Sequence, residues 1–169
     1  KKEVSQILKL SFENNIPVMP RGAGTSLSGG AIPLEKSISL TMSRLNKIIE
    51  IDPINKIATV EPGVVNLDLS IEASKYNLYY APDPSSQKVC TIGGNVAENA
   101  GGPHCLSAGV TTNHVLGLEI VTINGEIAWI GGQTNEKPGY DLRSIFIGSE
   151  GTLGVTTKIC VKLQDTPKH

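Results

Sequence analysis

The chain has 169 residues, enough for one domain of ordinary size with a hydrophobic core. Its formal net charge of −1 gives no support to nucleic acid or an anionic membrane as the main partner. Three cysteines without a C-x-x-C spacing argue against a disulfide scaffold or a zinc ribbon and fit a reducing cytosol, and no apolar run is long enough to span a bilayer.

The first half of the chain predicts a mixture of helices and strands. Apolar residues at helical spacing predict an amphipathic helix over 4–15, and IPVMP (16–20) is typical of a short buried strand. A second strand is predicted over 37–42. The β-rich runs on either side of PIN (53–55) predict a hairpin, and the segment that follows predicts a helix over 66–76 capped by Asn66.

The second half predicts another short helix and a second hairpin. The helix lies within TIGGNVAENAGG (91–102), which has a glycine pair near each end. In the hairpin, over 115–132, Asn124 and Gly125 form the turn, where both are expected to take positive φ. The run GVTTKICVKL predicts a closing strand. Because helices and strands do not alternate regularly, we expect an α+β fold rather than a doubly wound sheet.

The stretch PRGAGTSLSGGAIP (20–33) has the character of an anion-binding loop. It is not a dinucleotide-binding turn, because Leu27 stands where the third glycine belongs, and it is not a P-loop, because Gly30 and Ala31 replace the lysine and the hydroxyl residue. Its glycines allow backbone N–H groups to converge, hydroxyl side chains add donors, and Arg21 adds a positive charge. The alternative is a mobile surface loop rich in turn residues.

Three later stretches share this character: APDPSSQ (81–87), TIGGNVAENAGG (91–102) and GSEGTLGV (148–155). Each alone is compatible with an ordinary turn. Four such segments in one domain indicate a long ligand that the backbone approaches along much of its length.

These motifs, with GLEIVTINGE and GYDLRSIF between them, resemble in the same order the flavin-binding domain of the FAD-linked oxidases, the vanillyl-alcohol-oxidase or PCMH-type family. Within it the chain is most similar to the D subunit of glycolate oxidase and to FAD-dependent D-lactate and D-2-hydroxyglutarate dehydrogenases. The resemblance implies an α+β, PCMH-type fold over residues 1–169. Two small α/β subdomains would hold FAD between them, in a fragment of a longer enzyme whose cap, or substrate, domain is absent.

The resemblance also implies which residues contact FAD. The first loop would wrap the pyrophosphate, the second segment would lie near the cofactor, the third would line its course toward the isoalloxazine, and the fourth would contact or support the adenosine end. In that order they are Arg21, Gly22, Ala23, Gly24, Thr25, Ser26, Gly29 and Gly30; Pro82, Asp83 and Ser86; Ile92, Gly93, Gly94, Asn99, Gly101 and Gly102; and Glu150, Gly151, Gly154 and Val155.

We expect non-covalent FAD. Thr25 stands where members with a histidine-linked flavin carry histidine, and Cys90 does not have the spacing of a cysteinyl link and is interpreted as a buried, inert thiol. We predict no catalytic residue and no metal ligand in this chain. His104 and His114 are the internal candidates for a base, and Arg143 is a candidate for a substrate cation. A lone histidine in a glycine-rich turn is more often structural or solvated, so both histidines are interpreted in that way, and Arg143 is interpreted as a helix-surface residue. The resemblance implies that the substrate groups lie mostly in the cap domain.

The function implied is hydride transfer from the Cα of a small 2-hydroxy acid to FAD, with the isolated chain inactive. One rival is an FAD domain of another oxidase of this fold, acting on a different alcohol or sugar acid. A second rival is a nucleotide-binding module without catalysis. The resemblance further implies a cytoplasmic enzyme with other glycolate-oxidase-type subunits or a membrane electron acceptor as partners, and a peripheral place at the inner membrane as one option.

Overall fold

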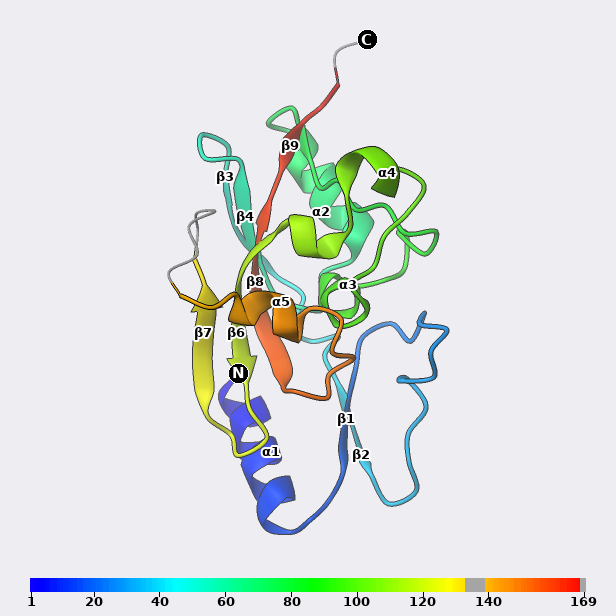
Figure 1. The fold of residues 1–169 in the computed structure, drawn as a ribbon, viewed down its shortest axis with the longest axis vertical. Helices are drawn as coiled ribbons and strands as arrows, with labels where there is room; N and C mark the ends of the chain where they lie inside the picture. Colours follow the sequence, from blue (N-terminus) through cyan, green and yellow to red (C-terminus); the bar gives the residue numbers. More distant parts are fainter. Residues whose placement is uncertain (133–138, 168–169) are drawn as a thin grey trace.

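The computed structural model describes residues 1–132 and 139–167 (Figure 1). In chain order the elements are α1 (Lys2–Glu13), β1 (Val18–Arg21), β2 (Ile38–Thr41), β3 (Ile48–Asp52), β4 (Ile57–Val60), α2 (Asn66–Ser74), β5 (Leu78–Tyr79), α3 (Ile92–Glu98), α4 (Cys105–Ala108), the 3-10 helix η1 (Thr111–Asn113), β6 (Val115–Val121), β7 (Ile127–Gly131), α5 (Leu142–Phe146), β8 (Val155–Lys162) and β9 (Gln164–Asp165). No helix within these described residues is long and apolar enough to cross a bilayer.

The largest sheet is antiparallel, with five strands in the order β3-β4-β8-β6-β7. Both predicted hairpins are present, as β3–β4 and β6–β7. β8, the predicted closing strand, lies inside the sheet between β4 and β6 (Figure 1). β6 is buried at every position, which explains its nearly continuous apolar sequence. The antiparallel sheet confirms the α+β prediction.

A second, smaller layer is formed by β1 and β2, which pair in parallel, beside α1. The apolar face of α1 confirms the predicted amphipathic helix, and a separate hydrophobic cluster joins its Val4 and Leu8 to Met42, Val121 and Val155. The main core gathers around α2, α3 and the large sheet. Since Val121 and Val155 belong to β6 and β8, this second cluster joins the small layer to the large sheet, and the division into two subdomains stays a prediction. β1 itself is only half-buried, so the prediction of a buried strand there was wrong.

The turn of the second hairpin differs from the prediction at Asn124. The N–H of Gly125 donates to the Thr122 carbonyl and that of Thr122 donates to the Glu126 carbonyl, both at 2.9 Å. Gly125 has φ +84°, whereas Asn124 is not among the residues with positive φ. The reason is the length of the loop: a tight turn followed by one left-handed residue needs only that residue to be glycine.

Two details of α2 also differ. Its N-cap is Val65, and Asn66 is the first helical residue, with its side chain fully buried rather than capping. Leu69 and Ala73 face the core, whereas Ile71 is exposed. In α3, the first glycine pair lies inside the first turn of the helix rather than before it.

A buried carboxylate, Glu119, lies within β6. It accepts hydrogen bonds from the Lys1 ammonium at 2.6 Å and the Thr157 hydroxyl at 3.0 Å. Burial alone raises the pKa of a carboxyl group, but these donors and the charge of Lys1 outweigh it, so the pKa of Glu119 lies below its usual range. The charge is therefore tolerated in the sheet because it is paired.

His114 is buried between η1 and β6. Its Nε2 lies 2.8 Å from the Ala108 carbonyl, to which it donates, and its ring stands edge-on to Tyr80. Burial lowers the pKa of His114 and the nearby Lys162 adds to this, against the opposing effect of the bond to Ala108. The ring is therefore a neutral core group near pH 7.

His114 should make the fold sensitive to acid. Because the pKa of His114 is lowered in the folded state, the unfolded chain binds a proton at this residue more readily. The contribution of neutral His114 to the free energy of unfolding is therefore complete above the ordinary pKa of 6.5 and is lost as the pH falls below it. Denaturant unfolding at fixed FAD should show stability falling between pH 7 and 5.5, with a slope from this group of at most about 1.4 kcal/mol per pH unit. His114→Gln, which still offers a donor to Ala108, should flatten that slope; an unchanged slope would contradict the assignment.

Candidate functional site

The glycine loop leaves β1 at Arg21 and returns to β2, so it connects two adjacent parallel strands. Gly24 has φ +73°, a conformation that residues with side chains rarely adopt. A Cβ atom there would also lie 2.6 Å from Arg21 Nη2. The loop is partly exposed and lines one hollow together with residues of α3.

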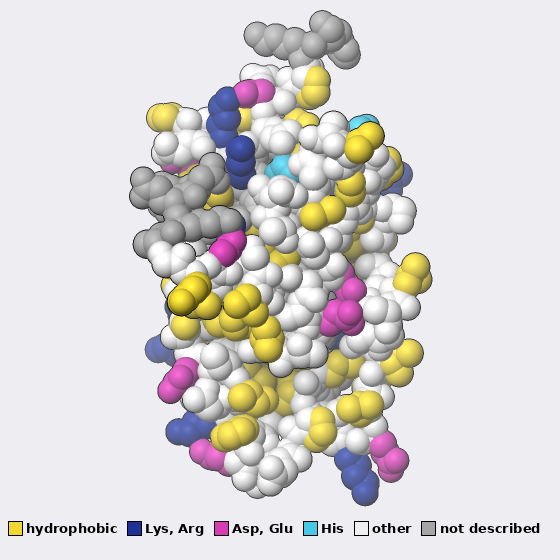
Figure 2. Space-filling view, viewed as in Figure 1, with side chains coloured by type: hydrophobic (Ala, Val, Ile, Leu, Met, Phe, Trp, Pro, Cys, Tyr) yellow, Lys and Arg dark blue, Asp and Glu magenta, His cyan; other side chains and the backbone are white. Residues whose placement is uncertain are grey.

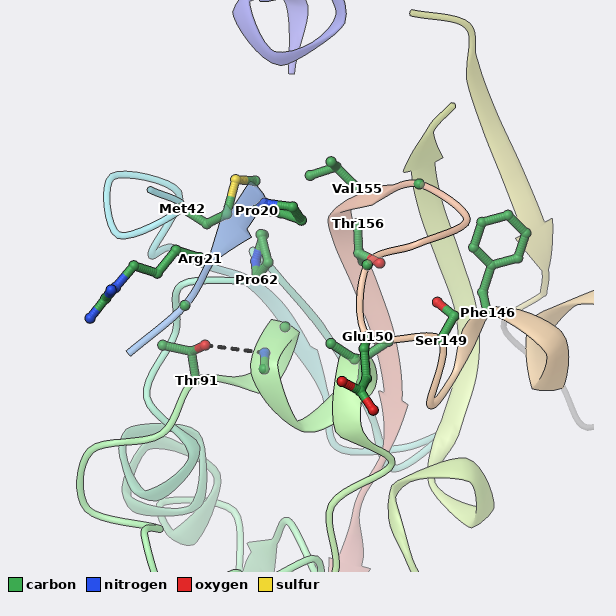
Figure 3. Close-up of a pocket in the computed structure, with 17 residues that line it drawn as sticks. Pro20, Arg21, Met42, Pro62, Thr91, Phe146, Ser149, Glu150, Val155 and Thr156 are labelled. Atoms are coloured by element: carbon green, nitrogen blue, oxygen red, sulfur yellow. Dashed lines mark hydrogen bonds between the residues drawn. The ribbon is translucent and has the colours of Figure 1, made fainter. Parts of the chain in front are cut away.

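Arg21 braces this loop. Its Nη1 donates to the Ala31 carbonyl at 3.2 Å, across the base of the loop. Figure 3 shows its side chain extending away from Glu150 and Thr156. The guanidinium therefore supports the loop directly, and its contact with a phosphate stays a prediction.

Two adjoining hollows lie beneath the loop. The narrower, of about 70 Å³, lies between β1–β2, α3 and the start of β8, and has apolar walls that include Met42, Pro62 and Phe146 (Figure 3). The wider, of about 440 Å³, lies between the glycine loop and α3. Both are lined by the same seven residues where they meet: Pro20, Arg21, Gly22, Thr91, Gly94, Ala97 and Glu150. They form one groove, which suits an elongated ligand.

α3 and the turn before β8 are fastened together along this groove. Thr91 caps α3 by accepting from the Gly94 N–H at 3.2 Å (Figure 3). The N–H groups of Gly148 and Glu150 donate to the carbonyls of Val96 and Ala97 at 2.8 and 2.9 Å. Segments about fifty residues apart in sequence therefore share one wall of the site.

The charges in the groove do not by themselves favour an anion. Arg21 is the one basic residue among the described residues that line it, whereas Glu98 and Glu150 are both present. The Glu98 carboxylate accepts from the Ser28 hydroxyl at 3.1 Å, which ties the loop to α3. A phosphate bound here would depend on backbone N–H groups and hydroxyls more than on net charge.

Most predicted cofactor residues line this groove. They are Arg21, Gly22, Ala23, Gly24, Thr25, Ser26, Gly30, Ser86, Gly93, Gly94, Glu150, Gly151, Gly154 and Val155. The structure thus brings together parts of all four segments. Their contact with FAD itself stays a prediction.

Seven predicted residues lie outside the groove lining: Gly29, Pro82, Asp83, Ile92, Asn99, Gly101 and Gly102. Ile92 is fully buried in the main core. Asn99 ends α3 with φ +48° and accepts from the backbone and hydroxyl of Thr112. Gly102 packs so closely on Asp83 that a Cβ there would overlap the Asp83 carbonyl oxygen. These positions shape the segments, and the motif pattern could not separate this role from direct contact.

Sequence reasoning missed several residues that do line the groove: Met42, Pro62, Cys90, Thr91, Asn95, Val96, Ala97, Glu98, Phe146, Ser149 and Thr156. The interpretation of Cys90 as buried is correct, but Cys90 also lines the wider hollow. Several of these residues adjoin the glycine motifs, which was the available signal. Met42 and Pro62 carry no such signal, because only the packing of β2 and β4 brings them to the groove.

The candidate acid–base and cationic residues lie elsewhere. His104 Nδ1 pairs with Asp83 Oδ2 at 2.5 Å, and this exposed pair lines a separate hollow beside Tyr79. His114 is a core residue. Arg143 was predicted on a helix surface, but it is buried, with Nη1 donating to the Val115 carbonyl, because α5 packs against β6.

Comparison with known proteins agrees with this geometry. Residues 1–131 match a family model described as "FAD binding domain". The chain is 51% identical over 166 residues to the glycolate oxidase subunit GlcD of Escherichia coli (strain K12), covering 98% of this chain and 33% of that protein. It is 40% identical to the D-lactate dehydrogenase of Anaerostipes hadrus, covering 99% and 35%.

A solved structure of alkyldihydroxyacetonephosphate synthase matches 99% of this chain and 33% of that one, with TM-score 0.83 and 25% identity, and this confirms the PCMH-type fold. The chain spans about a third of the length of the relatives it matches. Since the family model covers most of its residues and the groove joins the four glycine-rich segments, this chain belongs to the FAD-binding domain family and has FAD as its cofactor.

Proposed function

We propose that this chain is the FAD-binding domain of a flavin-dependent 2-hydroxyacid dehydrogenase of the glycolate oxidase GlcD type, within a longer enzyme. The observation that carries the proposal is 51% identity to GlcD over nearly the whole chain. The D-lactate dehydrogenase relative supports the same class of substrate, because glycolate and lactate are both 2-hydroxy acids.

The groove fits FAD in both shape and donors. The loop residues Gly22–Ser28 line the wider hollow and offer backbone N–H groups and hydroxyls to the pyrophosphate, and Gly22 also lines the narrower hollow. The apolar walls of the narrower hollow suit a flat ring, and the wider hollow suits a larger one. Bound FAD supplies the hydride acceptor, and this chain's residues hold and orient it.

The base and the cation that a 2-hydroxy acid needs are proposed to come from another part of the enzyme. Among the described residues, His104 and His114 both lie outside the groove lining. Apolar side chains gather over α5 on one face of the molecule (Figure 2), where Leu142 and Ile145 are about half exposed. An exposed apolar face of this kind suits a surface that meets a further domain.

Two rivals remain in the same proposal: an oxidase of this fold with a different alcohol or sugar acid as substrate, and a nucleotide-binding module without catalysis. The similarity to alkyldihydroxyacetonephosphate synthase indicates that this fold also occurs in an enzyme that is not named as a 2-hydroxyacid dehydrogenase. We further propose a cytoplasmic enzyme with partner subunits or a membrane electron acceptor. The naming of GlcD as one subunit of an oxidase supports the proposal of partner subunits.

The complete enzyme should transfer hydride from a 2-hydroxy acid to its flavin. The FAD-loaded protein, expressed from its whole gene, is mixed without oxygen with glycolate, D-lactate or D-2-hydroxyglutarate, and the flavin absorption band is followed. Rapid, stoichiometric bleaching by at least one acid is expected. Bleaching by none of them, in a protein that holds FAD, would exclude this substrate class.

Gly24→Val should weaken FAD binding by at least about tenfold, equivalent to about 1.4 kcal/mol. Valine resists φ +73°, and its side chain would meet the Arg21 guanidinium. The matched control is Gly139→Val, which has φ +81°, has no atom of the described residues within 4 Å of an added Cβ, and lies outside the groove lining. The affinity of each variant is measured by titration with FAD. Equal affinities of the two variants for FAD would contradict the role of the glycine loop in FAD binding.

FAD should be held without a covalent bond. Acid precipitation of the holoprotein should leave the yellow flavin in the supernatant. If flavin stays with the pellet, the thiol of Cys90 is the first group to test, because its residue lines the wider hollow. Loss of the retained colour in Cys90→Ser would then overturn the non-covalent assignment.

A further inference from the structure

Asn66 is fully buried, and its side-chain amide makes no capping hydrogen bond to the helix that it begins. It is the first residue of α2 and does not cap it. Leu69 and Ala73 provide the buried apolar side of the same helix. Placing an amide in such a position is unfavourable unless its hydrogen-bonding groups are used.

Asn66 holds both ends of the segment 82–90. Its Nδ2 donates to the Pro82 carbonyl at 3.0 Å, and its backbone N–H donates to the Cys90 carbonyl at 2.9 Å. The next residue, Leu67, donates from its backbone to Gln87 at 3.2 Å. The course of 82–90 is therefore set by the first turn of α2.

The same amide also holds α3. Asn66 Nδ2 donates to Asn95 Oδ1 at 2.8 Å, and Asn95 Nδ2 in turn donates to Cys90 Sγ at 3.3 Å. Both Asn95 and Asn66 are buried. Two amides in series thus join α2, α3 and the segment 82–90 through the two bonds of Asn66 Nδ2, whereas Asn66 Oδ1 is buried without a partner among the described residues. Hydrogen bonds between buried groups favour one arrangement of the elements that they connect.

This network lies directly behind one wall of the groove. Ser86, Cys90 and Asn95 line the wider hollow, and none of them lines the narrower one. Asn66 lines neither hollow. It therefore acts on a ligand only through the wall that it holds, and only on the part of a ligand that contacts that wall.

We propose that Asn66 is a positioning residue for FAD, and that it orders the wall that contacts the riboflavin half. The inference rests on FAD binding in this groove. The tricyclic isoalloxazine is larger than adenine and suits the part of the wider hollow that borders Ser86, Cys90 and Asn95. The adenosine then takes the narrower hollow, and the pyrophosphate lies along the glycine loop, where Gly22 lines both hollows. Asn66 then contributes to affinity by preorganising the wall before the cofactor arrives.

The test compares FAD with ADP as probes, because ADP lacks the riboflavin half. In Asn66→Ala, affinity for FAD should fall by at least about tenfold, while affinity for ADP should stay within about twofold. The circular dichroism of the bound flavin should also change, which a loss of overall stability would not produce. The control is Leu69→Ala, on the same helix and in the core, which should not separate the two probes.

Asn66→Ser, which keeps a small polar side chain, decides the question if the alanine variant does not fold. Equal losses for FAD and ADP in a folded variant, or no loss for either, would overturn the positioning role. A larger loss of affinity for ADP than for FAD would indicate that the cofactor lies in the opposite direction in the groove. This result would also overturn the positioning role. Failure of the unaltered protein to bind FAD would instead refute the groove assignment.

Discussion

The pairing of β8 with both β4 and β6 is the interaction on which the candidate site depends. It places the last long strand of the chain inside the sheet and carries the turn 148–154 to the end of α3. There the backbone of Glu150 bonds to Ala97, and Gly151 packs against Pro20 of β1. Without this pairing, the four glycine-rich segments would not share a groove.

The groove in which we propose that the FAD pyrophosphate binds has no surplus of positive charge among its described lining residues. Its one described basic lining residue, Arg21, is engaged with the loop carbonyl of Ala31, and Glu98 and Glu150 stand nearby. Affinity must then come from oriented N–H groups, which carry no net charge and need no counterion. The shape of the backbone, held by contacts such as that of Asn66 with Pro82, is accordingly the property that the site needs most.

Local patterns were reliable where one segment decides its own structure. The amphipathic spacing of Val4 and Leu8 predicted α1, and the apolar runs predicted both hairpins. The local patterns gave wrong predictions where a polar side chain could either act locally or be buried against a distant segment. Asn66 looked like a helix cap and Arg143 like a surface residue, but both are buried because partners distant in sequence, Asn95 and Val115, accept their hydrogen bonds.

Glycine clusters and hydroxyl residues indicated a long ligand that the backbone approaches, and the resemblance of their order along the chain to the FAD-linked oxidases predicted the FAD-binding family. The same pattern could not separate residues that line the groove from those that only shape it. Ile92 and Asn99 belong to the motif yet face the core or cap α3, while Met42 and Pro62 reach the groove from segments without a motif. That distinction depends on strand order and on contacts between distant segments, which arise only when the chain is folded.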